Sequence, residues 1–321
     1  EGFNWRQPGG TEAIMRGPAT EVNGSNWNFA KLWGTKTAGI VEHDALIHQP
    51  TANYVDYAYG MANGLPITDP ESGYDPTHPF LNRDPRFYHD IVFDGFKYIK
   101  EKVGADSDKK PYEYCQMYTG GNLRIDNDQA SRTGYYTQKL APHTANVIDG
   151  VYNWGSSLSC YLSYMRLAEV YLLYAEAGAA AGGASYKSSN YSKTAEDAIN
   201  TIRDRVGAAH VNAKYTADKN LFMDEVRRER ACELSFEGHR WNDLQRWLLL
   251  TEYPYTIKQS AEFSRKESDE FYTQNDPREA EVAGYGYKTI LERSYDSKHY
   301  FLPFKEADVN LYQGFTQNPG W

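Results

Sequence analysis

The stretch RRERACELSFEGHRWNDLQRW, residues 227–247, decides the fold because it mixes a dense set of charges with large apolar side chains. We expect it to lie in a helix that runs from about Leu221 to about Gly238, and in the turn that follows. Residues four apart lie on one side of a helix. One side of this helix is therefore expected to carry an acidic stripe. It consists of Glu225, Glu229, Glu233 and Glu237.

Two interpretations compete for the acidic stripe: a metal or acid–base site, and a set of ion pairs inside a scaffold. Carboxylates on one helix stand in a row, roughly 6 Å apart, and do not converge on one point. The neighbouring arginines, Arg228 and Arg230, favour ionised, paired carboxylates over carboxyls with a raised pKa. We therefore interpret the stripe as scaffold, with Trp241 and Trp247 in the core, and expect neither catalysis nor a metal there.

A pair of helices is expected before this stretch. The segment GGASYKSSN (182–190) separates the two, and Thr194 with Asp197 forms a capping box that starts the second. Gly207 stands where helices often end in a glycine. Small residues let two antiparallel helices approach closely, as in a tetratricopeptide-like pair, although no repeat of about 34 residues is visible. The first helix is expected from Tyr161, and these residues share one face: Tyr161, Tyr164, Ala168, Tyr171, Ala175 and Ala179.

The other segments carry weaker signals. Residues 1–50 have the composition of a loop, and residues 51–63 that of a short helix with Thr51 at its N-cap. Residues 64–87 are predicted to form ordered turns. Short strands are expected over 87–95 and 97–103, as a hairpin across Asp94 and Gly95, and again over 133–141. Residues 254–290 are expected to be polar, tyrosine-rich and irregular.

The bulk composition excludes some classes of protein. The chain has 321 residues and a net charge of −9, so no basic patch is available for nucleic acid. No stretch is long and apolar enough to span a bilayer. The chain has neither an initiator Met nor a secretory signal at its start, so we expect it to be processed or a fragment. Aromatic residues make up 15% of the chain, which favours a binding surface.

Several segments together resemble the SusD/RagB family. The resemblance covers residues 51–250 and 299–321. It implies a mainly α fold, in which tetratricopeptide-like helix pairs pack with a loop-rich portion containing short strands. The segments are PTANYVDYAYGMANGLPITDPESGYDPTHPFLNRDPRFYHDIVFDG (50–95), YMRLAEVYLLYAEAGA (164–179), AINTIRDRVG (198–207), VRRERACELSFEGHRWNDLQRW (226–247), YFLPF (300–304) and QNPGW (317–321).

The resemblance also implies a function. Members of this family are surface lipoproteins of Bacteroidetes outer membranes that bind glycans, and sometimes peptides, without catalysis or a cofactor. They deliver the ligand to a SusC-like TonB-dependent transporter. They are commonly longer than this chain, which we therefore interpret as the C-terminal part of a larger protein whose lipid anchor lies elsewhere.

Within the chain the resemblance suggests three regions and a scaffold role for the acidic stripe. The regions are a loop-rich part (1–160), a helical part (161–250) and an irregular segment that packs back on the same domain (251–321). We expect Arg240→Ala to lower stability by a few kcal/mol, as breaking a buried ion pair does. The residues assigned to the scaffold are Glu229, Arg230, Glu233, Glu237, Gly238, Arg240 and Trp241.

A sugar-binding site needs a flat aromatic ring and several fixed donors and acceptors, because a sugar has apolar C–H faces and a rim of hydroxyls. The segment before Thr51 contains both kinds of residue, and the segment VYNWGSS (151–157) contains a further tryptophan. Trp33 is equally well explained as a core anchor. The two histidines have no third partner and are not expected to bind a metal. The ligand-binding candidates are Asn26, Trp27, Trp33, His43, His48 and Trp154.

Three other functions stay open at this point: a peptide binder on the same scaffold, a glycan-cleaving enzyme, and an interaction scaffold without a small ligand. A glycan-cleaving enzyme needs two carboxylates facing each other across a cleft. Four of the available acids lie in the turn-rich segment, where we expect them to cap turns. The acids that the sequence leaves available are Asp44, Asp56, Asp69, Glu71, Asp75, Asp84 and Asp90.

Overall fold

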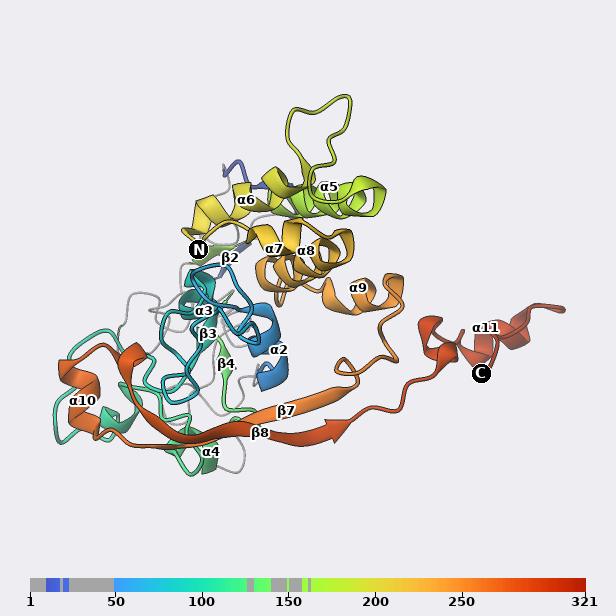
Figure 1. The fold of residues 1–321 in the computed structure, drawn as a ribbon. Coiled ribbons are helices and arrows are strands. Elements are labelled where there is room, and N and C mark those ends of the chain that lie inside the picture. Colours follow the sequence, from blue (N-terminus) through green and yellow to red (C-terminus); the bar gives the residue numbers. More distant parts are fainter. Residues whose placement is uncertain are drawn as a thin grey trace.

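The computed structural model describes residues 10–17, 20–22, 49–125, 130–139, 149, 158–160 and 163–321. Stacked helices form one side of the molecule, a long two-stranded ribbon forms the opposite side, and loop-rich segments with short helices lie between them (Figure 1). The fold is mainly α-helical with a few short strands, as the sequence predicts. Within the part of the chain described, no helix combines the length and the hydropathy that a membrane span needs.

The helices differ widely in length. They are α2 (Ala52–Ala58), α3 (Pro85–Asp90), α4 (Asn122–Ile125), α5 (Leu167–Gly182), α6 (Ala195–Val206), α7 (Ala213–Thr216), α8 (Lys219–Glu233), α9 (Arg240–Arg246), α10 (Asp269–Gln274) and α11 (Glu306–Leu311). The strands pair two by two, each pair antiparallel. The pairs are β1 (Ala13–Arg16) with β6 (Ser163–Arg166), β2 (Thr20–Val22) with β5 (Leu158–Cys160), β3 (Ile91–Val92) with β4 (Tyr136–Thr137), and β7 (Ile257–Arg265) with β8 (Val282–Glu292).

Helices α5 and α6 pack together through small residues, and α8 adds Phe222 and Val226 to the same cluster. Ala175 and Ala179 of α5 are buried in one cluster with Ala195 and Ala198 of α6. The approach is close, because a Cβ atom added to Gly178 would lie 2.8 Å from the Cβ of Ala195. The predicted tetratricopeptide-like contact between two helices is therefore present.

The start of α6 follows its sequence signals closely. The Thr194 side chain accepts a hydrogen bond from the Asp197 backbone N–H, and the Asp197 side chain accepts one from the Thr194 N–H. Gly207 closes the helix in the left-handed region, at φ 74°. The capping box and the terminal glycine are thus confirmed.

Two predicted helix boundaries are wrong. The helix expected from Tyr161 begins at Leu167, and Tyr164 lies in strand β6, where it is 57% exposed. The helix expected to reach Gly238 ends at Glu233. The backbone adopts positive φ at Phe236 (63°) and at Gly238 (89°), and this turn separates α8 from α9.

The hairpin predicted across Asp94 and Gly95 is also wrong. Pro85 at the first turn and the Asp84 side chain, which accepts from the Arg86 N–H, start helix α3 instead. The strand that follows, β3, pairs with β4, inside the strand predicted over 133–141. Asp94 is fully buried and accepts hydrogen bonds from the backbone N–H of Met117 and from Arg265.

The segment predicted to be irregular over 254–290 contains the longest strands described, β7 and β8. Ser260 and Ala261 of β7 are fully buried, and β7 packs against α2. Most of β8 from Tyr287 onward is exposed on both faces. The exposed half of β8, from Tyr287 to Glu292, has no alternating apolar pattern and so gives no period-two signal in the sequence.

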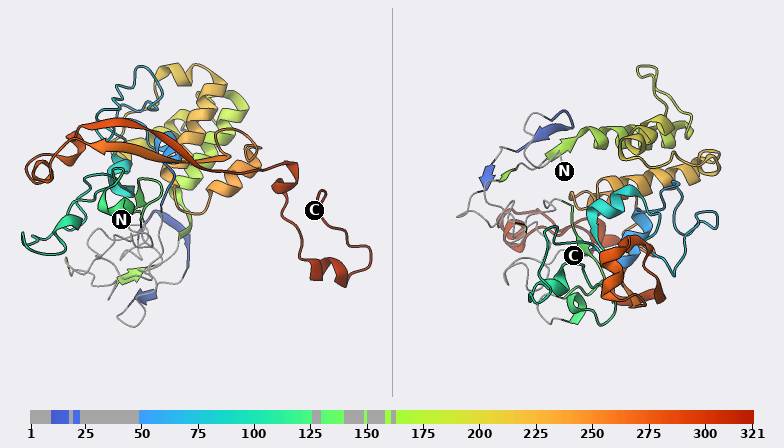
Figure 2. Two further views of the ribbon diagram at one scale, coloured as in Figure 1. Left: turned by 90° about the horizontal axis from the view of Figure 1, so that it is seen from below. Right: turned by 90° about the vertical axis from the view of Figure 1, so that its left-hand side faces the viewer.

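The C-terminal residues 301–321 project from the body of the molecule, with most of their side chains exposed (Figure 2). The sequence predicts that the whole segment 251–321 packs back on the domain; β7 within it packs against α2, and the prediction for the segment as a whole stays a prediction. In the turn-rich segment, Asp69, Asp75 and Asp84 accept hydrogen bonds from the backbone N–H two residues on, as expected for turn caps. Glu71 instead pairs with Lys214 at 2.9 Å.

Candidate ligand-binding pocket

The acidic stripe of α8 faces arginines from other helices. Glu229 accepts hydrogen bonds from Arg86 Nη1 at 2.6 Å and from Arg203 Nε at 2.9 Å. Burial by itself would raise the pKa of this carboxyl, but the Arg86 and Arg203 guanidiniums outweigh burial and hold the pKa below its usual range. Glu229 is therefore ionised, and it holds no proton for acid–base chemistry.

Glu233 and Glu237 lie at the centre of a second ion-paired group. Arg166 donates from Nη1 to Glu233 at 2.7 Å and from Nε to Glu237 at 2.7 Å, and Lys139 lies 2.9 Å from Glu237. Burial would raise the pKa of Glu237, but Lys139 and Arg166 lower it below its usual range. These contacts join α8 to the start of α5 and to the loop-rich part. The scaffold role of both glutamates stays a prediction.

Arg230 links α8 to α9. Its Nε donates to both carboxylate oxygens of Asp243, at 2.9 and 2.8 Å, and both residues are buried. Trp247, at the end of α9, is half-buried and donates from Nε1 to Glu176 at 2.8 Å. The expectation that Trp247 is a core residue is therefore wrong, because its ring lies at the surface of the helical layer.

Arg240 departs from the predicted pattern. Its guanidinium has no ion pair within the described residues, and its Nη1 is buried without a hydrogen-bond partner. It lies instead over three rings, with Cζ at 5.7 Å from the centroid of Tyr54, 5.3 Å from Tyr57 and 5.4 Å from Tyr255. The expected loss of an ion pair on Arg240→Ala is wrong, because the turn through Gly238 carries Arg240 away from the acidic stripe.

Arg240 lines a pocket of about 540 Å³, which we call the Arg240 pocket. This volume lies within the range of small-molecule sites. The pocket lies where α2, the turn between α8 and α9, and one end of the β7–β8 ribbon meet, the end at which Ile257 pairs with Glu292. Its lining residues are Pro50, Thr51, Asn53, Tyr54, Tyr57, Phe236, Gly238, Arg240, Trp241, Leu244, Pro254, Tyr255, Ile257, Lys258 and Arg293.

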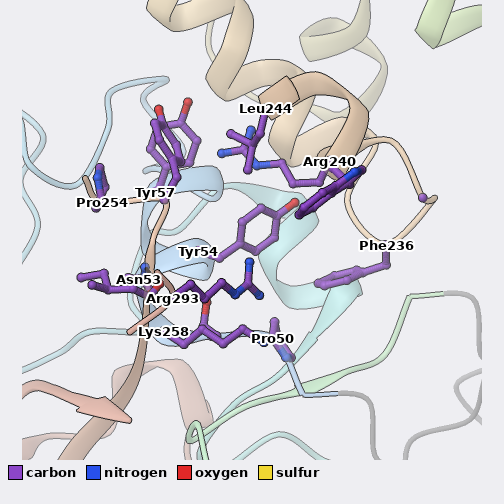
Figure 3. A pocket seen from close by; sticks show the side chains of 15 residues that line it. Pro50, Asn53, Tyr54, Tyr57, Phe236, Arg240, Leu244, Pro254, Lys258 and Arg293 are labelled. Carbon is purple, nitrogen blue, oxygen red and sulfur yellow. Dashed lines mark hydrogen bonds between the residues drawn. The ribbon is translucent and has the colours of Figure 1, made fainter. Parts of the chain in front are cut away.

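Five of the fifteen residues that line the pocket are aromatic. Figure 3 shows the Tyr54 ring in the middle of the group, with Arg240 on one side and Arg293 and Lys258 on the other. The Tyr54 hydroxyl donates to the Ala231 carbonyl at 2.7 Å, which fixes the ring against α8. Trp241 was expected in the core, but it is half-buried and forms part of the wall, with its ring edge-on to Tyr295 at 5.8 Å.

The charges that line the pocket are all positive. Arg240, Lys258 and Arg293 contribute three cations, and the described residues of the lining include no aspartate or glutamate. Burial and the neighbouring Arg293 lower the pKa of Lys258. Burial raises the pKa of Tyr54 and of Tyr57, so both phenols are neutral. The pocket therefore presents flat rings and positively charged donors.

The ligand-binding residues expected from the sequence lie outside the described residues: Asn26, Trp27, Trp33, His43, His48 and Trp154. They stay predictions. Sequence reasoning missed the pocket residues Tyr54, Tyr57 and Tyr255, although Tyr54 and Tyr57 are three apart and so share one face of the predicted 51–63 helix. Within the described residues, no group of three or more His, Cys, Asp or Glu side chains is placed to hold a metal ion.

Comparison with protein families identifies the class of the chain. The sequence model of the SusD family matches residues 11–321. The chain therefore belongs to the SusD family. No curated protein sequence matches it.

Solved structures of this family share its fold. A SusD-like protein from Bacteroides fragilis has a TM-score of 0.66 and 22% identity, over 97% of this chain and 54% of its own. A SusD-like carbohydrate binding protein from Bacteroides fragilis has a TM-score of 0.52 and 22% identity, over 82% and 47%. A SusD superfamily protein from Bacteroides vulgatus has a TM-score of 0.51 and 15% identity, over 98% and 52%. The chain thus spans about half the length of these proteins.

Proposed function

We propose that this chain is part of a surface-exposed, lipid-anchored outer-membrane subunit that captures oligo- or polysaccharide and delivers it to a SusC-like TonB-dependent transporter. The observation that carries the proposal is the family match over residues 11–321. A protein of similar fold is described as a SusD-like carbohydrate binding protein, which supports the ligand class.

The Arg240 pocket supports a binding role. Sugar rings pack on aromatic faces while their hydroxyls take hydrogen bonds, and Tyr54, Tyr57 and Tyr255 supply such faces. Among the described residues the lining contains no carboxylate, whereas glycoside hydrolysis commonly uses two. Two acids that the sequence offered as catalytic candidates instead form ion pairs: Asp56 with Arg83 at 2.9 Å and Asp84 with Arg86 at 2.8 Å. We propose binding without catalysis.

Affinity electrophoresis tests this function. The chain is run through gels that contain plant, fungal or host polysaccharides, beside the variants Trp27→Ala, Trp33→Ala and Tyr57→Ala. The matched control is Tyr312→Ala, which removes an exposed ring that does not line the pocket. We expect retardation by at least one polysaccharide, reduced in one or more of the first three variants and unchanged in the control. Migration unaffected by every polysaccharide contradicts the proposal. Assay of new reducing ends tests for cleavage, which we do not expect.

A peptide ligand is the second candidate, and one observation favours it. Strand β8 pairs only with β7 in the described part of the chain, and its outer half from Tyr287 to Glu292 is exposed. Such a free edge accepts an extended peptide as an added strand. Binding of a random peptide library, weakened by Thr289→Pro and unaccompanied by polysaccharide binding, supports this alternative over the first.

A further inference from the structure

Arg240, which is half-buried, differs from the buried arginines of the described residues, each of which has a carboxylate partner. These pairs are Arg83 with Asp56, Arg86 with Asp84, Arg166 with Glu233, Arg203 with Glu229, Arg228 with Glu225, and Arg230 with Asp243. Arg240 has none within the described residues, and its buried Nη1 donates to nothing. A buried charged donor without an acceptor is unfavourable, so the site favours a ligand that supplies one.

The aromatic rings around Arg240 do not replace an acceptor. Three rings lie 5.3–5.7 Å from the Arg240 Cζ and make cation–π contacts with the guanidinium. Such contacts stabilise the charge but give the Nη1 donor no hydrogen-bond acceptor. A planar carboxylate matches this fork of donors with two parallel hydrogen bonds.

The other charged residues of the pocket also favour an anionic ligand. Lys258 and Arg293 bring two more cations to the lining, and neither has an ion pair among the described residues. This is unexpected in a chain of net charge −9, in which acids outnumber bases. Burial and Arg293 disfavour the charged form of Lys258, and a bound anion offsets both effects.

We propose that the Arg240 pocket binds an acidic sugar residue, whose carboxylate pairs with the Arg240 guanidinium while its apolar ring face packs on Tyr54 and Tyr57. This inference rests on the proposed glycan-binding function and narrows its ligand class to uronic-acid-containing saccharides. Lys258 and Arg293 strengthen the attraction from the opposite side of the pocket.

Titration calorimetry with matched acidic and neutral oligosaccharides tests the inference. The probes are oligogalacturonate, oligomannuronate and hyaluronan oligosaccharides, each beside its methyl-esterified form, which keeps the ring and removes the charge. The full chain is compared with Arg240→Gln, Lys258→Gln and Arg293→Gln. The matched control is Arg278→Gln, an exposed arginine that pairs with Asp276 outside the pocket.

We expect at least one acidic oligosaccharide to bind the unmodified chain more tightly than its ester. Arg240→Gln weakens that binding by about thirtyfold or more, because it removes one partner of a desolvated charge pair. Lys258→Gln and Arg293→Gln weaken it less, the control does not change it, and affinity for the ester is similar in all variants. If Arg240→Gln does not fold, the Lys258 and Arg293 variants carry the same test.

Three results overturn the inference and differ in meaning. If a neutral polysaccharide or an ester binds as tightly as its acid, and the charge variants change nothing, the ligand class is wrong while the glycan-binding function stands. If no saccharide binds at all, the proposed function fails as well. Sulfated oligosaccharides are tested as a further set of probes. If only these bind, the inference that Arg240 recognises a sugar carboxylate is contradicted.

Discussion

Replacing Glu233 with glutamine tests the ion-paired scaffold at its centre. The Glu233 side chain is 4% exposed and accepts hydrogen bonds from Arg166 at 2.7 Å and from Arg86 at 3.1 Å, with Arg205 as a third partner. Burial by itself would raise the pKa of this carboxyl, but these three guanidiniums hold it well below its usual range. The substitution Glu233→Gln keeps the shape and removes the charge.

The expected loss of stability follows from the arginines that Glu233→Gln leaves in place. Glutamine places one N–H₂ group against arginine donors and takes one counter-charge from the buried guanidiniums of Arg86 and Arg166, which keep their other carboxylate partners. Removing one partner of a buried pair destabilises proteins by about 3–5 kcal/mol. With an unfolding entropy of about 2 cal/mol/K per residue, this loss lowers the Tm of a 321-residue chain by roughly 5–8 °C.

Thermal and urea denaturation, followed by far-ultraviolet circular dichroism, measure this loss. The matched control is Glu281→Gln, because Glu281 pairs with Lys266 at the surface, where both side chains are largely exposed. We expect the control to change stability by less than about 1 kcal/mol. If Glu233→Gln melts at the temperature of the unmodified chain, or no lower than the control, the ion-paired scaffold does not hold the helices together.

Three further predictions concern local structure and pH. Thr194→Ala removes the capping box of α6 and should lower the free energy of unfolding by about 1 kcal/mol in urea titrations; an unchanged midpoint would contradict this. Gly95→Ala should destabilise by about 2–4 kcal/mol, because φ is 84° and the new Cβ would lie 2.5 Å from the Tyr272 ring. Gly73 has φ 72° and open space around it, so Gly73→Ala should lose only the stability that the strained backbone costs. Equal losses of stability in the two variants would show that the contact with the Tyr272 ring contributes nothing. Because the buried glutamates have folded-state pKa values below the ordinary value of about 4.3, their stabilisation is present above that pH and is lost as the pH falls. Scanning fluorimetry should therefore show a falling Tm between about pH 5 and pH 3, with a shallower fall in Glu233→Gln than in the unmodified chain.

Local signals made the helical pair predictable. The capping box, the apolar stripe and Gly207 all lie within one short segment, so α6 needs no distant partner to be recognised. The β7–β8 ribbon has no such signal. Its pairing joins Ile257 to Glu292, and the exposed half of β8 carries no alternation of apolar and polar residues.

The pocket could not be predicted for a different reason. Tyr54, Arg240 and Tyr255 come from separate segments, and folding alone brings them together. Their sequence context was misleading as well, because Arg240 follows a run of paired charges that suggests an ion pair. The positive φ at Phe236 and Gly238 turns the chain before Arg240, and no pattern of charges shows that turn.

A crystal structure of the chain bound to an acidic oligosaccharide tests the central claim most directly. The account predicts a sugar ring against Tyr54 and Tyr57, with its carboxylate within hydrogen-bonding distance of the Arg240 guanidinium. A saccharide bound elsewhere, with the Arg240 pocket empty or filled by protein, would contradict it.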